Sequence, residues 1–189
     1  AMTMLNNRLN ELRQTANPPF TNASAGYGEF FLAKTKEAFS LDARSKVDGI
    51  DLAMKTVLEE AERARRFGFT ATEYERARAN YMQGVESAYN EREKTKSGSY
   101  VNEYVNNFLD KEPIPGIEFE YMLTKQMAPN IPVEAINKMM QQLITDNNQV
   151  VLLAGPEKEG VKYPTKEEIA ALLKQMKSFD LKPYEDKVS

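Results

Sequence analysis

The chain has 189 residues, of which 41% are hydrophobic and 10% aromatic, enough for a globular domain with a hydrophobic core. Its formal net charge of −3 provides no basic field for nucleic acid or for an anionic membrane surface. It contains no histidine and no cysteine, which excludes disulfides, thiolate metal sites and the commonest general base and metal ligand. No apolar run approaches the roughly 18 residues that span a membrane, and the first residues lack a signal-peptide pattern.

A helix and a β-hairpin are predicted for the first 44 residues. Leu5, Leu9 and Leu12 recur at helical spacing, which predicts an amphipathic helix over 3–16 that ends at the following prolines. An aromatic-rich run and a cleanly alternating run predict strands over 20–33 and 37–44, joined by a turn at 34–36. Because the chain enters its helical pattern at once, we expect the natural protein to begin further upstream.

Helices dominate the prediction for residues 47–144. Their expected ranges are 47–67, 71–96, 99–110, 117–127 and 132–144. Gly68 suits the left-handed position after the first of these helices, and Thr70–Glu73 matches a capping box at the start of the second. The buried faces of the second and third helices are expected to contain Tyr74, Ala77, Tyr81, Val85 and Ala88, and Val101, Tyr104, Val105, Phe108 and Leu109.

Charged residues near residue 60 are interpreted as solvated surface. Glu59 and Glu60 are adjacent on a helix, so their side chains point about 100° apart and do not converge on one ion. Arg63, Arg65 and Arg66 could form a basic site, but a solvated cluster favoured by the helix dipole is the simpler interpretation.

A strand, a helix and a linker are predicted for the C-terminal part of the chain, residues 149–189. Residues 149–154 are β-branched and aliphatic and predict a buried strand, and Thr165–Glu168 is a second capping box that opens a helix to about 177. The tail 178–189 has little core pattern and is interpreted as a linker. Three strands are few for so many helices, so we expect a sheet with an open edge, through which the fragment could self-associate.

No pattern in the sequence predicts catalysis or metal binding. Carboxylates are the only strong metal ligands left, and no loop has the calcium-binding spacing. A Ser–Lys pair at Ser97 or Ser99 is the only nucleophile scheme left without histidine, and serines are expected at this helix break in any case. A glycosidase-type carboxylate pair stays open, because nothing marks two of the 28 acids as such a pair. We therefore expect no catalytic, substrate-binding or metal-binding residue in this chain.

Three short motifs occur in a fixed order along the chain. They are Met4–Arg13 (MLNNRLNELR), Gly68–Arg78 (GFTATEYERAR) and Ile131–Asn137 (IPVEAIN), and the predicted strand from Val150 to Pro156 follows them. Together they resemble motifs of the insulinase/pitrilysin-type zinc peptidases and mitochondrial processing peptidases, over about residues 4–156. Each motif is short, but their order and spacing are specific in combination.

The resemblance implies a place within such a peptidase. That family is built from two homologous repeats, each with two α+β halves, and its zinc motif, His-x-x-Glu-His, lies in the first half of the active repeat. Because this chain has no histidine, it resembles the second half of one repeat, a part that helps to wall the chamber that holds the peptide substrate.

The family also implies a test for which repeat is present. In the repeat without zinc, an Arg and a Tyr seven residues apart help to hold substrate at the metal. Here Arg13 occupies the Arg position, but Phe20 stands at the Tyr position and has no hydroxyl. This departure favours the zinc-bearing repeat, and Arg13 is then interpreted as a helix-surface residue.

We therefore predict an α+β fold with helices packed on one face of a mainly antiparallel sheet. Residues 1–156 would form a non-catalytic half-repeat that is incomplete at its N-terminus, and 157–189 a helix and linker toward the next repeat. The expected function is the chamber-forming part of a zinc-dependent metalloendopeptidase. Zinc would be held by the rest of the same polypeptide, which is the expected partner together with the peptide substrate of the parent protein.

Two alternatives stay open from the sequence. The chain could be a half-repeat of a non-peptidase structural subunit with the same fold, in which the upstream zinc motif would be degraded. It could also be an unrelated α+β interaction module. The family resemblance favours the periplasm or cell envelope over the cytoplasm.

Overall fold

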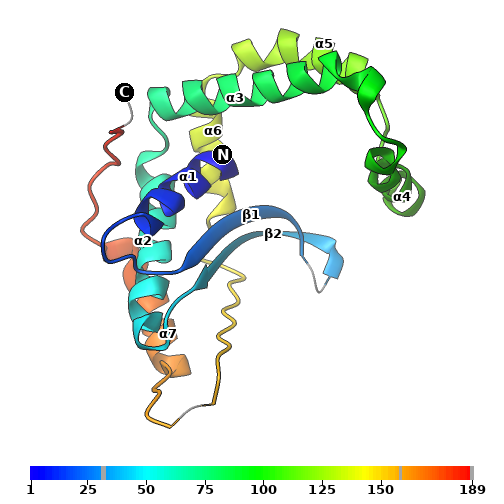
Figure 1. The fold of residues 1–189 in the computed structure, drawn as a ribbon. Helices are drawn as coiled ribbons and strands as arrows, with labels where there is room; N and C mark the ends of the chain where they lie inside the picture. The colour runs from blue at the N-terminus through cyan, green and yellow to red at the C-terminus, as the bar shows by residue number, and fades with distance from the viewer. Residues whose placement is uncertain (31–32, 158, 188–189) are drawn as a thin grey trace. The chain divides into compact units, whose positions relative to one another are not determined.

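A computed structural model describes residues 1–30, 33–157 and 159–187 of the chain (Figure 1). In chain order the helices and strands are α1 (Met2–Arg13), β1 (Asn22–Phe30), β2 (Ala33–Arg44), α2 (Ile50–Phe67), α3 (Ala71–Asn90), α4 (Val101–Asp110), α5 (Ile117–Met127), α6 (Val133–Leu143) and α7 (Lys166–Gln175). They divide into two compact units, one of residues 1–73 with 133–189 and one of residues 74–132. None of the helices in the described part has the length and apolar character needed to cross a bilayer.

The first unit contains the antiparallel sheet, so the predicted α+β class is confirmed. β1 pairs with β2 in a register that places Ala25 opposite Leu41 and Tyr27 opposite Phe39. α1 packs on β1, and the Asn6 amide both donates to the Ala25 carbonyl (2.9 Å) and accepts from the Ala25 N–H (2.7 Å). The amide of Asn6 thus satisfies backbone groups of β1 that would otherwise be unpaired.

The predicted turn at 34–36 is wrong, because these residues lie inside β2. The register continues through Glu29 opposite Glu37 to Phe30 opposite Ala33, with an irregularity between Glu29 and Phe30. β2 therefore begins at Ala33, nearer the tip of the hairpin than the predicted start at residue 37. Residues 31 and 32, between the strands, lie outside the described residues.

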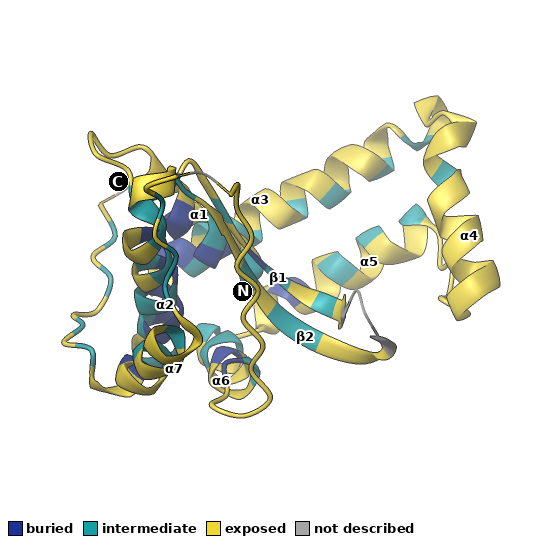
Figure 2. Ribbon diagram, turned by 90° about the horizontal axis from the view of Figure 1, so that it is seen from below, coloured by how far each residue is buried: buried dark blue, intermediate teal, exposed yellow. Residues whose placement is uncertain are grey.

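The core of the first unit lies between α1, α2, α6 and the sheet (Figure 2). Helix α2 contributes small side chains, which let α1 and α6 pack closely against it. The buried apolar residues of this core include Met4, Leu5, Leu9, Phe20, Ala53, Val57, Ala61, Ala64, Met140, Ile144 and Met176. This arrangement follows the amphipathic stripes predicted for the first helix and for residues 47–67.

Both predicted capping boxes are confirmed. The Glu73 N–H donates to the Thr70 hydroxyl (3.2 Å) while the Thr70 N–H donates to the Glu73 carboxylate (2.8 Å). Thr165 and Glu168 make the same reciprocal pair at the start of α7. Gly68 adopts φ +71° between α2 and α3, as expected of a glycine after a helix end.

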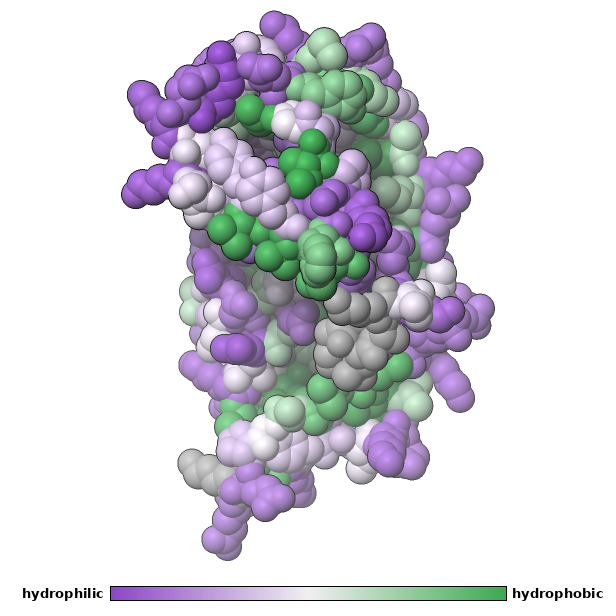
Figure 3. Space-filling view, turned by 90° about the vertical axis from the view of Figure 1, so that its right-hand side faces the viewer, coloured by the Kyte–Doolittle hydropathy of each residue, from purple (hydrophilic) through white to green (hydrophobic). Residues whose placement is uncertain are grey.

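The second unit is less buried than its sequence pattern predicts. The expected buried faces of α3 and α4 are wrong: Tyr81 is 61% exposed, Tyr104 62% and Phe108 76%. No residue of α4 is buried, and Figure 3 shows apolar side chains at the surface on the side that carries α4. Amphipathic spacing marks a face that can be covered, but within the described part of this unit nothing covers it. α3 also ends at Asn90 instead of 96, and short 3₁₀ turns follow it before α4.

The predicted buried strand at 149–154 is wrong as well. These residues form no strand, and Val150 is 80% exposed and Leu152 83%. A strand requires a second backbone to complete its hydrogen bonds, and none of the described segments lies paired with this one.

Candidate functional site

Arg8 lies on the buried face of α1, between Leu5 and Leu9 at helical spacing, and is only 1% exposed. A charged side chain in such a place must be paired, because an isolated buried charge is very costly. Its surroundings therefore form the most distinctive polar cluster in the first unit.

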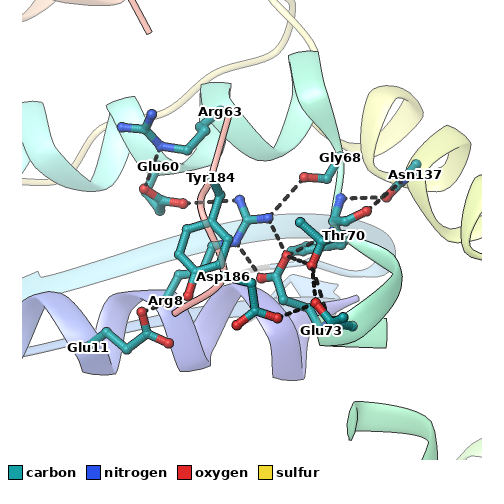
Figure 4. Close-up of polar contacts among 12 residues, drawn as sticks. Arg8, Glu11, Glu60, Arg63, Gly68, Thr70, Glu73, Asn137, Tyr184 and Asp186 are labelled. Atoms are coloured by element: carbon teal, nitrogen blue, oxygen red, sulfur yellow. Dashed lines mark hydrogen bonds and ion pairs between the residues drawn. The ribbon is translucent and has the colours of Figure 1, made fainter. Parts of the chain in front are cut away.

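Each of the three nitrogens of the Arg8 guanidinium donates at least one hydrogen bond (Figure 4). Its Nε and Nη2 donate to the two oxygens of Glu73 at 2.7 and 2.8 Å. Its Nη1 donates to Glu60 at 3.2 Å, and Nη2 also donates to the Gly68 carbonyl at 3.0 Å. The two-pronged contact with Glu73 matches the planar fork that makes arginine suited to carboxylates. Arg8 thereby ties α1 to α2, to the loop after α2 and to the start of α3.

Aromatic rings close the cluster. The guanidinium carbon of Arg8 lies 4.9 Å from the ring centre of Phe69 and 4.2 Å from that of Tyr184, within the range of cation–π contacts. Burial alone would lower the pKa of Arg8, but the hydrogen bonds and charges of Glu73 and Glu60 outweigh it and raise the pKa. Arg8 therefore stays charged.

A second set of hydrogen bonds fixes the loop that faces Arg8. The Asn137 side chain of α6 accepts from the Phe69 N–H (2.7 Å) and donates to the Phe69 carbonyl (3.2 Å). Gly68 must adopt a positive φ beside this amide, and a Cβ at Gly68 would lie 2.3 Å from Asn137 Cγ. The loop conformation thus requires both the glycine and the asparagine.

The C-terminal tail packs onto the same cluster instead of leaving the first unit as a free linker. The Tyr184 hydroxyl donates to Glu11 of α1 at 2.7 Å, and the Thr72 hydroxyl donates to Asp186. Arginines of α2 bind carbonyls of this region: Arg66 those of Met176 and Phe179, and Arg63 that of Lys182. Burial and the hydrogen bond to Glu11 both raise the pKa of Tyr184 above its ordinary range. The division of the chain at residue 156 stays a prediction.

The predicted solvated cluster on α2 is wrong in part. Glu60 is 5% exposed and lies between Arg8 and Arg63, and Glu62 is fully buried. Glu62 bonds both Arg65, at 2.6 Å, and Arg66. Burial alone would raise the pKa of Glu62, but these two arginines outweigh it and lower the pKa. The arginines are thus paired and do not form a free basic site.

The contacts of the cluster join α1, α2, the loop after α2 and the start of α3. Both carboxylates that face Arg8, those of Glu73 and Glu60, are paired with its guanidinium. The residues do not fit a zinc site, since the chain has no histidine or cysteine, and the described residues contain no group of acids placed to hold a metal. The expectation that no residue of this chain is catalytic stays a prediction.

Arg13 and Phe20, the two positions compared with the family's Arg and Tyr, differ in their exposure to solvent. Arg13 is exposed at the end of α1, where it donates to Asn10 at 2.7 Å. Phe20 is 1% exposed, in the core. The structure thus gives Phe20 a packing role, and Arg13 a helix-surface contact.

No sequence pattern predicted the cluster, although Arg8, Gly68, Glu73 and Asn137 all lie within the three family-like motifs. The local pairs Glu60–Arg63 and Glu62–Arg66 stand three and four residues apart and could have been found from helical spacing. The pair Arg8–Glu73 joins residues 65 apart, and no local pattern reveals it.

Comparisons with known proteins agree with this architecture. No protein-family model matches the chain. Over 95 residues it is 37% identical to a protein of Arabidopsis thaliana described as "Zinc protease PQQL-like"; the match covers 50% of this chain and 10% of that protein. The chain thus spans a small part of this curated relative.

The fold itself matches solved structures. The first half of the periplasmic protease PqqL from Escherichia coli matches with a TM-score of 0.80 at 18% identity, over 98% of this chain and 40% of that one. The longer PqqL structure matches with the same TM-score, over 21% of its chain. The likeness to the insulinase/pitrilysin-type zinc peptidases is therefore confirmed, as homology to a PQQL-like zinc protease over half of this chain and as the PqqL fold over nearly all of it.

Proposed function

We propose that this chain is a non-catalytic, chamber-forming half-repeat of a zinc-dependent metalloendopeptidase. The observation that carries the proposal is the extent of the structural match. Nearly the whole chain superimposes on a part of PqqL that is 40% of its first half and 21% of the longer chain. These shares fit one of four α+β halves, and the match to a first half favours the first, zinc-bearing repeat.

The placement of the family-like motifs supports a structural role. Arg8, Gly68, Glu73 and Asn137 come from three separate motifs and meet in one hydrogen-bonded cluster. The bonds of these residues join α1, α2, α6 and the start of α3 inside the first unit. A half-repeat that forms part of a chamber wall has to keep its helices in a fixed arrangement, and hydrogen bonds between the helices do this.

Zinc and the catalytic groups would come from the rest of the parent polypeptide. In the peptidases that this chain resembles, the metal is held by a histidine motif, and this chain has no histidine. The partners of the chain are then the zinc-bearing half and the second repeat of the same polypeptide. The peptide substrate is a partner of the assembled protein. Because the matched PqqL is described as periplasmic, we also propose a periplasmic or envelope location.

A metal and activity assay tests the proposal on the chain alone. Chelator-washed protein is incubated with one equivalent of zinc, dialysed and measured for metal, and casein-type substrates are assayed in parallel. We expect less than about a tenth of an equivalent of retained zinc, because the described residues contain no group of three possible ligands, and no cleavage above buffer. Stoichiometric zinc or cleavage that survives repeated purification would contradict the proposal.

The gene provides a second test that separates the two peptidase-fold alternatives. An intact His-x-x-Glu-His motif encoded upstream supports the peptidase, whereas a degraded motif supports a structural subunit of the same fold. The homology to a PQQL-like zinc protease favours the first outcome and argues against an unrelated interaction module.

A further inference from the structure

Residues 179–186 lie on the surface of the first unit without forming a helix or a strand. They follow the 3₁₀ turn Met176–Ser178, in which Met176 is buried, and none of them is buried itself. Figure 1 shows this segment as an irregular chain that runs beside α2, where side chains of α2 bind it. A segment with few buried apolar contacts has low local stability, so it can open while the rest of the unit stays folded.

Two arginines of α2 bind carbonyl groups of this segment. Arg66 donates to the Phe179 carbonyl at 2.8 Å, and Arg63 donates to the Lys182 carbonyl. Each arginine also pairs with a glutamate of α2 itself, three or four residues away. Both arginines therefore keep a charged partner when the segment leaves, and they stay in place to bind it again.

Tyr184 is the central anchor of the segment (Figure 4). Its ring centre lies 4.2 Å from the guanidinium carbon of Arg8, and its hydroxyl donates to Glu11 at 2.7 Å. Two residues further on, Asp186 accepts a hydrogen bond from the Thr72 hydroxyl. The hydrogen bonds of Arg8 to α2, to the following loop and to α3 do not involve Tyr184, so they persist when the ring leaves. Water can then solvate the freed face of the guanidinium, and no buried charge is left unpaired.

We propose that residues 179–186 form a releasable strap, which shortens the connection to the next repeat when it is docked and lengthens it when it is released. This inference rests on the proposed function, in which a second repeat of the same polypeptide follows this half-repeat. The eight residues of the strap span at most about 26–29 Å when fully extended, so release adds up to this length to the connection. A longer connection lets the two repeats separate further and admit a larger substrate to the chamber.

Proteolysis by endoproteinase Glu-C measures release of the strap in this chain. Cleavage after Glu185, within the strap, tracks the released population, and cleavage after Glu157, at an exposed position outside it, is the reference. Each rate is divided by that of a synthetic peptide of the same sequence, which removes any effect of a substitution beside the cleaved bond. We expect wild type to be cut after Glu185 at least about tenfold more slowly than after Glu157, because a docked strap cannot enter the protease. Equal corrected rates at the two sites in wild type overturn the proposal.

Variants of Tyr184 separate docking from folding. Tyr184→Phe keeps the ring but loses the hydrogen bond to Glu11, and it should raise the corrected rate after Glu185 about fivefold. Tyr184→Ala also loses the contact with Arg8, and it should raise this rate to about the reference rate. Tyr81→Ala, at an exposed position of α3, is the matched control and should leave the rate unchanged. The glutamates of α2 should stay uncut in every variant, whereas cleavage of α2 together with the strap would show that the tail is an integral part of the fold and overturns the proposal.

The full-length product of the gene tests the effect of the strap on the two repeats. In small-angle X-ray scattering, Tyr184→Ala should increase the maximum dimension of the protein by about 10 Å or more, and Tyr81→Ala should not change it. Equal maximum dimensions of wild type and Tyr184→Ala overturn the proposal. Zinc content of the full-length protein is measured separately. An increased dimension in a protein that holds no zinc leaves the strap standing and removes the proposed peptidase function.

Discussion

Arg8 shows how much of this fold depends on one charged side chain. It occupies a helical position that its neighbours Leu5 and Leu9 mark as core, and it is as buried as they are. Its charge is balanced by the carboxylates of Glu60, on α2, and Glu73, on α3. Its guanidinium also donates a hydrogen bond to the Gly68 carbonyl. Glu60 also accepts from Arg63 and Glu73 also accepts from Thr70, but Arg8 is the group that joins the two carboxylates, so the loss of Arg8 would remove the positive charge they share.

Removal of the Arg8 charge should be strongly destabilising. Arg8→Met keeps the length of the side chain but leaves Glu73 and Glu60 buried without their common partner, so we expect a loss of about 3–5 kcal/mol in the free energy of unfolding. The measurement is urea unfolding followed by circular dichroism. Arg13→Met, at the exposed end of the same helix, is the control and should change stability by less than about 0.5 kcal/mol.

The reason for the loss can be separated from packing. In the triple variant Arg8→Met, Glu60→Gln, Glu73→Gln the buried carboxylates are neutral, and glutamine at position 73 can still serve the capping box. A substantial part of the lost stability should then return. A triple variant as unstable as the sum of its single changes would show that the charges are not coupled.

The loop between α2 and α3 is the element on which the cluster depends. Gly68 adopts φ +71°, and its carbonyl accepts a hydrogen bond from Arg8. The amide of Asn137 bonds both backbone groups of the next residue, Phe69, so it cannot move aside without losing those bonds. The short loop is thus bonded both to α1, through Arg8, and to α6, through Asn137.

Two glycine-to-alanine changes should have opposite effects. Gly68→Ala places a methyl group 2.3 Å from Asn137 Cγ at a positive φ, and we expect it to destabilise the protein by about 2–3 kcal/mol. Gly84→Ala lies inside α3 with no atom within 4 Å of the new Cβ, and we expect a gain of about 0.5–1 kcal/mol. Thermal unfolding of both variants beside wild type measures the difference. A neutral Gly68→Ala would show that the loop relaxes more easily than its contacts indicate.

At the scale of the whole molecule, the two compact units differ in how much they bury. The first unit contains the buried cores of α1 and α2, whereas no residue of α4 or α5 is buried. Within the second unit, stacked rings of Tyr89 and Tyr121, 4.5 Å apart, join α3 to α5, with Arg92 over one ring and Lys125 over the other. Aromatic contacts of this kind add modest stability where a core is small.

The second unit should therefore open more often than the first. We expect the amides of α4 to exchange at least about 100-fold faster than those of α2, because few apolar contacts resist local unfolding of α4. Hydrogen exchange with peptide-level mass spectrometry measures both helices in one experiment. Equal protection of α4 and α2 would show that the exposed apolar face of α4 is covered in solution.

The sequence by itself determined the helices, both capping boxes and the hairpin, because each of these depends on residues close together in the chain, and the order of three short motifs along it indicated the family likeness. It also determined that the chain cannot provide a histidine or cysteine ligand, since composition does not depend on folding. Only the tertiary structure decided which amphipathic faces are covered, and it left Phe108 and Leu152 exposed where the pattern predicted burial. Only the structure brought Arg8 to Glu73 and Asn137 to Phe69, because burial and long-range pairing depend on which segments meet in space, and a local pattern contains no information about the partner.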